Sequence, residues 1–382
     1  MQKPRLMTPG PAPVPEDVLL ELARPVIHHR SAEAKDVVKE VTAGLKDVFR
    51  TKNDVMILTA SGTGAMEAAA VNAIPPGGKA IVLNAGYFAA RWANLCKAFG
   101  IEAINLATEW GQPVDPGTVA NALASHPDAA CVMGTLSETS TGTGHPIEAI
   151  GKVVAESDAL FAVDGISGVG AMECQTDAWG IDILCVGSQK ALMLPPGLAF
   201  IAVSEKAWKK IDAFDARCFY FNLKVARKKA QEFDTPFTPA HTLILALRQS
   251  IRRILAEGIE NVWDRHRRMS EACQSGIRAL GLELFSSRPA EGLTAFRVPA
   301  GLKDQAIRDG LAERFGITTV GGQDKLKGQI IRVGHMGYMD ELDVISGLAA
   351  LEMVLNDLGY DLEPGVAVTA AQTIFLGQPA RV

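Results

Sequence analysis

Two short segments of the chain combine an ionisable side chain with small residues that let the backbone turn. Residues 164–167 read Asp-Gly-Ile-Ser and residues 187–190 read Gly-Ser-Gln-Lys, with Pro-Pro-Gly following at 195–197. Asp164 ends one apolar run and Lys190 follows another, so in a parallel sheet both would lie at the carboxyl edge, where ligands bind. A carboxylate there can keep a pyridine nitrogen protonated, and a lysine amine can form a Schiff base with an aldehyde.

A glycine-rich turn stands earlier in the chain. Ser61, Gly62 and Thr63 follow the apolar run 55–59 and open a helical pattern. Small residues let the backbone close on an anion, and the unpaired N–H groups at a helix start point towards it. Many turns of this kind only cap a helix. The turn therefore indicates an anion site chiefly in combination with Lys190.

The elements that must position these residues alternate along the chain from about residue 50 to residue 203. Short apolar runs, most of them continuous, are typical of strands that helices cover on both faces. Ala-rich helical patterns lie between the runs, and this alternation predicts an α/β fold with a mostly parallel sheet. The predicted strands are residues 55–59, 80–83, 102–106, 129–133, 160–163, 183–186 and 198–203. The predicted helices are residues 64–73, 89–99, 116–125 and 147–157.

The chain changes character after Pro239. Residues 242–280 show a continuous helical pattern, which predicts one long helix. Short strand candidates and two further helical patterns follow and indicate a smaller α+β domain, and we expect residues 363–382 to form a loosely packed extension. The strand candidates are residues 283–285, 293–297, 318–320 and 330–334, and the helical patterns are residues 304–314 and 339–358.

Composition limits the classes of function. The 382 residues exceed what one simple core organises, and 38 basic against 43 acidic side chains do not favour nucleic-acid binding. The longest apolar stretch, 191–203, is interrupted by prolines and is shorter than the roughly 20 residues that span a bilayer. The six cysteines are scattered without a Cys-x-x-Cys pair, and the histidines lack metal-ligand spacing. We therefore expect a cytoplasmic protein without a metal site, a membrane segment or a nucleic-acid partner.

The string Ser-Gln-Lys-Ala-Leu at 188–192, with Pro-Pro-Gly after it, resembles the class V aminotransferases of fold type I. The likeness is strongest to the alanine–glyoxylate, serine–glyoxylate and serine–pyruvate group, and it runs from Thr8 to about Gly337. It implies pyridoxal 5′-phosphate (PLP) as the cofactor and a homodimer with sites at the interface. It also implies an N-terminal arm at residues 1–15, a large PLP-binding domain at 16–255, a small C-terminal domain at 256–360 and an extension at 361–382.

The resemblance also implies roles for individual residues. Lys190 would carry the cofactor and, with Asp164, act in catalysis. Phe88 would stack on the pyridine ring, with Tyr87 and Trp92 as competing aromatics. The other implied cofactor contacts are Ser61, Gly62 and Thr63 at the phosphate, Thr139 at a ring substituent, and Ile166, Gln189 and Thr238, the last in a loop that crosses to the neighbouring subunit.

Arg332, between apolar residues at 330–334, would clamp the substrate carboxylate, with Gly10 of the N-terminal loop nearby. A planar fork of donors suits a carboxylate, and a structural salt bridge is the alternative explanation for this arginine. Ser137 departs from the family, in which many relatives carry His or Asn, and this leaves the substrate preference open. The basic side chains of Arg30, Arg91 and Arg217 keep acidic substrates in consideration.

We expect transfer of an amino group from alanine or serine to glyoxylate or pyruvate by a ping-pong mechanism. A cysteine desulfurase-like lyase is one alternative, but it needs a nucleophilic cysteine on a small-domain loop, whereas Cys273 stands in a helical pattern. A non-catalytic subunit of a larger complex is another, because relatives carry the name of a soluble hydrogenase small subunit. A dehydrogenase is disfavoured because no Gly-x-Gly-x-x-Gly follows the first strand.

Overall fold

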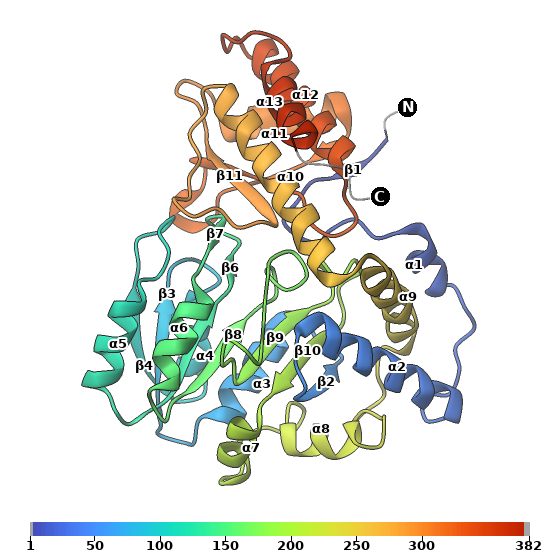
Figure 1. Cartoon of the computed structure of the whole chain (residues 1–382), viewed down its shortest axis with the longest axis vertical. Helices are drawn as coiled ribbons and strands as arrows, with labels where there is room; N and C mark the ends of the chain where they lie inside the picture. The colour runs from blue at the N-terminus through green and yellow to red at the C-terminus, as the bar shows by residue number, and fades with distance from the viewer. Residues whose placement is uncertain (1–2, 378–382) are drawn as a thin grey trace.

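The computed structural model describes residues 3–377. Its centre is a seven-stranded sheet with the strand order β2-β10-β9-β8-β5-β3-β4, in the lower half of Figure 1. Only β10 runs antiparallel to its neighbours, so the predicted α/β fold with a mostly parallel sheet is confirmed. The strands are β2 (Asp54–Leu58), β3 (Lys79–Asn84), β4 (Glu102–Ala107), β5 (Ala129–Thr135), β8 (Leu160–Asp164), β9 (Ile183–Gly187) and β10 (Ala199–Val203).

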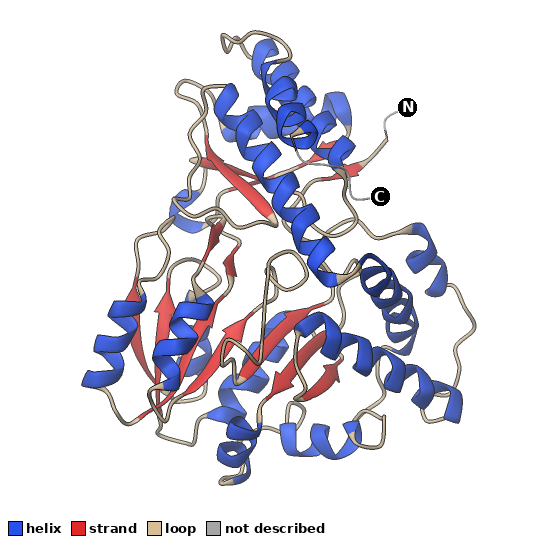
Figure 2. Cartoon of the chain, viewed as in Figure 1, coloured by secondary structure: helices blue, strands red, loops and turns tan. Residues whose placement is uncertain are grey.

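Helices cover both faces of this sheet, which explains why its strands read as continuous apolar runs (Figure 2). On β3, Ile81 packs into the core on one face and Val82 into the core on the other. One face carries α2 (Ala32–Phe49), α5 (Pro116–Ser125), α6 (Ile147–Ala155) and α9 (His241–Glu257). The other carries α3 (Gly62–Ala73), α4 (Ala90–Ala98), α7 (Glu205–Asp212) and α8 (Leu223–Ala230).

The C-terminal part forms a second core around a three-stranded antiparallel sheet of order β11-β14-β13. Its helices pack together on this sheet above the central one in Figure 1. The strands are β11 (Leu293–Arg297), β13 (Val320–Gly321) and β14 (Ile330–Gly334). The helices are α10 (Ile259–Ala279), α11 (Asp304–Phe315), α12 (Glu341–Asp357) and α13 (Val366–Leu376), with a short 3-10 turn η1 (Asp324–Leu326).

Several predictions for this C-terminal part were wrong. The helix predicted at 242–280 is two helices, α9 and α10, separated at Gly258, whose φ of 85° is unfavourable for other residues. The strand predicted at 283–285 contributes only an isolated bridge between Leu284 and Phe296. The strand predicted at 318–320 is divided between β12 (Ile317–Thr318) and β13. The predicted division into domains stays a proposal.

The C-terminal extension is packed rather than loose. Helix α13 lies against α10 and α12, and it buries Ala367, Ala371 and Phe375 in their shared core. A loose segment would leave these apolar side chains in water, so the burial explains why the helix docks. The part of the predicted extension at 378–382 lies outside the described residues.

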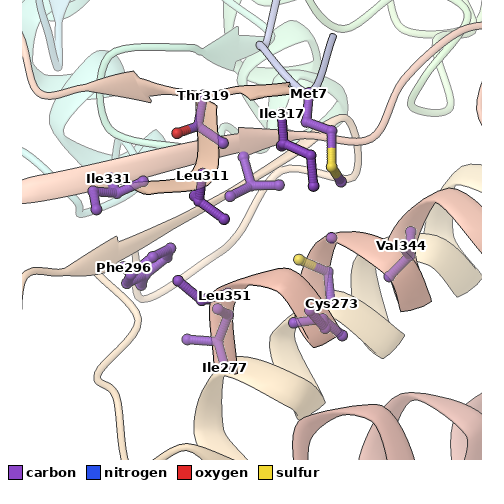
Figure 3. A pocket seen from close by; sticks show the side chains of 13 residues that line it. Met7, Cys273, Ile277, Phe296, Leu311, Ile317, Thr319, Ile331, Val344 and Leu351 are labelled. Atoms are coloured by element: carbon purple, nitrogen blue, oxygen red, sulfur yellow. The ribbon is translucent and has the colours of Figure 1, made fainter. Parts of the chain in front are cut away.

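The N-terminal arm ties the two parts together. Strand β1 (Arg5–Leu6) pairs in parallel with β12, and Met7 enters the C-terminal core beside a small apolar cavity of about 20 Å³ (Figure 3). The Gly334 N–H then donates to the Met7 carbonyl at 2.8 Å, and the Ala12 N–H donates to the Gln189 carbonyl at 2.9 Å. The arm therefore runs from the C-terminal core to the lysine loop, followed by α1 (Glu16–Glu21).

Gly334 is required where β14 touches this arm. A Cβ atom at this position would lie 2.1 Å from the Thr8 carbonyl oxygen, and backbone on both sides leaves no flexible group to move. We expect Gly334→Ala to lower the free energy of unfolding by about 1–3 kcal/mol, as overpacking does. Denaturant unfolding followed by circular dichroism measures this. Gly117→Ala is the control, because this helical position is exposed and the atom nearest to the new Cβ is the Asp115 Oδ2 at 3.1 Å, the end of a side chain that can move, so stability should change much less. Equal stability of the Gly334 variant and the wild type would contradict the packing described.

Candidate functional site

A cavity of about 300 Å³ opens at the carboxyl edge of the central sheet and brings most of the predicted site residues together. Strands β8 and β9 are parallel neighbours, so the residues that follow them reach the same edge. Arg332 and Thr238 are the two predicted residues that do not line the cavity. The lining residues are Gly10, Pro11, Ser61, Gly62, Thr63, Phe88, Arg91, Ser137, Thr139, Asp164, Ile166, Ser167, Gln189, Lys190 and Pro196.

Lys190 is buried, and its amine donates a hydrogen bond to the Pro9 carbonyl at 2.5 Å. Burial lowers the pKa of Lys190 to about 8; the negative charge of Asp164 opposes this effect, and the positive charges of Arg332 and Arg91 add to it. A larger fraction of this amine is therefore neutral and nucleophilic near neutral pH than in an exposed lysine. Gly10 is required by the close approach of the arm, because a Cβ atom there would lie 2.3 Å from the Lys190 Nζ.

Asp164 is the last residue of β8 and is almost completely buried. Burial raises the pKa of Asp164 to about 7, although the Ile166 N–H donates to its Oδ1 at 2.9 Å and opposes the rise. A cationic group that entered the cavity beside this carboxyl would stabilise its charged form. The residue can therefore hold a protonated ring nitrogen.

The glycine-rich turn forms the start of α3, as its sequence predicts. Ser61 is the N-cap residue and makes no side-chain capping bond, so the first N–H groups of the helix remain available to an anion. A Cβ atom on Gly62 would lie 2.5 Å from the Ile166 Cδ1, so only glycine lets Ile166 pack against the turn. The Gln189 Oε1 is buried nearby and has no hydrogen-bond partner among residues 3–377.

Phe88 stands in the turn before α4, which is held by a residue that the sequence did not single out. Glu138, at the end of β6 (Ser137–Glu138), is completely buried and accepts hydrogen bonds from the N–H groups of Phe88 and Ala89 at 3.3 and 2.8 Å. Ser140 donates to the same carboxylate and accepts from the Tyr87 N–H. An acidic residue in the otherwise hydroxyl-rich segment 137–141 was the available signal.

Hydroxyl groups form another wall of the cavity. The Thr139 and Ser167 side chains share a hydrogen bond of 2.7 Å. The Ser137 Oγ lies on the same wall and is buried without a hydrogen-bond partner in the described part of the chain. An unpartnered buried hydroxyl is costly unless a ligand or water satisfies it, so this wall is suited to a polar ligand.

Arg332 lies on β14 just behind Thr139 and forms no ion pair with any described residue. Its guanidinium donates to the Thr139 carbonyl at 2.9 Å and to the Gly321 carbonyl at 2.8 and 3.0 Å. Burial lowers the pKa of Arg332 to about 10, so the group is still charged at neutral pH. Arg332 is therefore a buried cation that carbonyl groups hold, and it does not form the structural salt bridge that was the alternative explanation.

The remaining candidates lie elsewhere. Thr238 is exposed in the loop 235–239, and its role toward a neighbouring subunit stays a proposal. Arg30 pairs with Asp234, and Arg217 is exposed, whereas Arg91 does line the cavity. In residues 3–377 no helix is long and apolar enough to cross a membrane, and no group of side chains is arranged to hold a metal ion.

Comparison with known proteins gives a consistent family. The model of the aminotransferase class-V family matches residues 14–344. The chain is 41% identical to the soluble hydrogenase small subunit of a Synechococcus species, over 97% of this chain and 98% of that protein. It is 33% identical to the L-aspartate–glyoxylate aminotransferase of Paracoccus denitrificans, over 96% and 95%. The crystal structure of ureidoglycine–glyoxylate aminotransferase from Bacillus subtilis is similar with a TM-score of 0.93 and 30% identity, over 98% and 99%.

The lowered pKa of Lys190 predicts its reactivity. Because the neutral amine is the nucleophile, Lys190 should react with formaldehyde and cyanoborohydride with a midpoint near pH 8. A short unstructured peptide with one lysine, whose amine has the ordinary pKa of about 10.4, is the reference. Peptide mass mapping after labelling at a series of pH values measures the midpoint of Lys190 and that of the reference. A Lys190 midpoint equal to that of the reference peptide would show that burial does not lower the pKa of this amine.

Proposed function

The chain belongs to the aminotransferase class-V family, and from this we propose that it moves an amino group from alanine or serine to glyoxylate or pyruvate. Members of this family depend on PLP, and the protein is a PLP-dependent aminotransferase. The observation that carries the proposal is the convergence of Lys190 and Asp164 in one cavity, with Arg332 behind its wall.

The residues present fit PLP. When bound, the cofactor supplies an aldehyde that exchanges with amino groups and a ring that withdraws electrons from the substrate carbon. Two buried polar atoms, the Ser137 Oγ and the Gln189 Oε1, have no hydrogen-bond partner in the part of the chain that the structure describes, and such a polar ligand would supply one. Lys190 would bond to the aldehyde carbon and Asp164 would hold the ring nitrogen. The other contacts proposed are Ser61, Gly62, Thr63 and Gln189 for the phosphate, Phe88 and Ile166 for the ring faces, and Thr139 for a ring substituent.

Lys190 would also move protons at the substrate. Burial lowers its pKa to about 8, so its amine could take a proton from the substrate α-carbon near neutral pH and would deliver it to the carbon that carried the aldehyde. Asp164 would keep its negative charge while the positive ring nitrogen lies beside it. One cavity of about 300 Å³ that also holds the cofactor leaves room for one substrate, so donor and acceptor would use it in turn, in a ping-pong mechanism.

Arg332 would bind the substrate α-carboxylate. It forms no ion pair within residues 3–377, although the negative charge of Glu138 acts on it, and its hydrogen bond to the Thr139 carbonyl holds it directly behind a residue that lines the cavity. A substrate carboxylate would pair with this cation directly, because a guanidinium can hold a carboxylate with two parallel hydrogen bonds. Gly10 would lie on the same side through its contact with the lysine.

The rival functions are less well supported. None of the six cysteines lines the cavity, and Cys273 is buried in α10, where burial raises its pKa to about 11, so a desulfurase-like thiolate is not available. A relative bears the name of a hydrogenase subunit, but a purely accessory role would not require a buried lysine and aspartate in one cavity. Aspartate is a second candidate donor, because Arg91 places an additional cation in the cavity.

We further propose a cytoplasmic homodimer. The exposed loop that carries Thr238 contains Phe237, which stacks on the partly exposed Tyr220 with ring centroids 4.9 Å apart, and Phe219 beside them is largely exposed. Aromatic groups that remain in water on an isolated chain are typical of a protein interface. A second copy of the chain on this surface would bring its own Thr238 loop to the neighbouring cavity.

The substrate proposal is tested by kinetics with the wild type and Arg332→Lys. With glyoxylate as acceptor, kcat/KM in the wild type should be higher for alanine or serine than for aspartate. In Arg332→Lys, kcat/KM should fall about ten- to a hundredfold for every donor. The reason is that a bidentate contact with the carboxylate becomes a contact with a single point charge, which costs roughly 1.5–3 kcal/mol.

Arg297→Lys is the matched control, because this exposed arginine lies on β11 of the same sheet and pairs with Glu283. It should behave as the wild type. A marked preference of the wild type for aspartate, or normal alanine kinetics in Arg332→Lys, would overturn the assignment of substrate or of clamp.

A further inference from the structure

Arg91, the second residue of α4, connects two parts of the cavity that come from different elements. Its guanidinium donates to the Thr63 Oγ1 at 2.8 Å, in the first turn of α3. The same guanidinium lies over the Phe88 ring, with its carbon 5.1 Å from the ring centroid, a distance at which the cation and the ring attract each other. The side chain is thus held on one side by a hydroxyl and on the other by an aromatic face.

Arg91 is not directly paired with a carboxylate in residues 3–377, and the Asp164 carboxyl on which its charge acts is the one proposed to hold the ring nitrogen. Among the residues described, Arg91 forms no ion pair, although it is half-buried and lines the cavity. Its charge reaches the cavity interior: after burial and the charge of Asp164 and Arg332, it is a further influence on the pKa of Lys190. Cations removed from water are normally paired, so an anion is expected to join Arg91 in the cavity.

Two anions enter such a site, a phosphate and a substrate carboxylate, and the contacts of Arg91 distinguish them. Thr63 belongs to the start of α3, where unpaired N–H groups and the helix dipole favour a phosphate. Arg332 is held by the Thr139 carbonyl instead, on the wall that faces the small sheet. The two arginines therefore have different neighbours, and Arg91 is the one that belongs to the phosphate end.

We propose, on the basis of the proposed function, that Arg91 is a residue of the phosphate subsite. Its guanidinium, fixed by Thr63 and Phe88, supplies the positive charge that binds the cofactor phosphate at the start of α3. The residue acts in cofactor retention, and it takes no part in proton transfer.

The test compares a phosphorylated and an unphosphorylated cofactor. The cofactor-free protein is titrated with PLP, with pyridoxal and with inorganic phosphate, and binding is followed by quenching of tryptophan fluorescence. Arg91→Gln should raise the Kd for PLP by about tenfold or more, as expected for a lost charge-assisted contact, and should leave the Kd for pyridoxal unchanged. The Kd of Arg91→Lys for PLP should lie between those of the wild type and of Arg91→Gln, because lysine retains the positive charge but lacks the planar fork of donors.

The salt dependence gives a second readout. Binding of PLP should weaken more steeply with increasing salt in the wild type than in Arg91→Gln, because the variant has one positive charge fewer that attracts the phosphate. Arg314→Gln removes one positive charge from an exposed position on α11 and should leave both Kd values unchanged. An equal rise of the Kd for PLP and the Kd for pyridoxal in Arg91→Gln would show that Arg91 has a merely structural role and would overturn the proposal.

The remaining outcomes are also distinct. An unchanged Kd for PLP, with a raised KM for aspartate alone, would assign Arg91 to a substrate carboxylate and overturn the phosphate proposal. Failure of the wild type to bind PLP would count against the proposed function itself. Should Arg91→Gln not fold, Arg91→Lys provides the same comparison, because it loses the planar fork that Thr63 and Phe88 hold and should raise the Kd for PLP but not the Kd for pyridoxal.

Discussion

Two ionisable side chains, Lys190 and Asp164, are buried in one cavity, and much of the surrounding structure compensates for their burial. Parallel pairing of β8 and β9 brings the ends of both strands to the same edge, and the lysine loop then turns back toward the aspartate. Burial shifts the two pKa values toward each other, to about 7 and about 8, so that both groups can change protonation near neutral pH. The Pro9 carbonyl of the N-terminal arm accepts from the amine and replaces lost water.

The segment 137–140 forms hydrogen bonds with both parts of the molecule. The carboxylate of Glu138 fixes the turn that carries Phe88, while the carbonyl of the next residue, Thr139, accepts from Arg332 on β14. One short segment thus sets both the aromatic platform and the cation proposed to bind the substrate. Because these bonds are buried, loss of any one partner would leave an unsatisfied polar group, which makes the arrangement stiff.

The central sheet and the edge that carries the site were predictable, because continuous apolar runs and the positions of Asp164 and Lys190 depend on local sequence. The break between α9 and α10 lies at Gly258, which is visible in the sequence. The apolar residues keep a helical spacing on both sides of this glycine, however, so the pattern predicts one helix. The role of Glu138 and the contact of Arg332 with Thr139 could not be predicted, because the residues in contact are about 50 and 193 positions apart and leave no spacing pattern in the sequence. The same holds for Arg91, whose importance depends on its meeting Thr63 and Phe88.

We propose that Lys190 is the residue that bonds covalently to the cofactor aldehyde. This proposal is tested by incubation of the protein with PLP, reduction with borohydride and peptide mass mapping. We expect a single phosphopyridoxyl group on the peptide that contains Lys190, and its loss in Lys190→Ala with the fold retained. A label on any other lysine, or undiminished labelling of the Lys190→Ala protein, would show that another residue carries the cofactor.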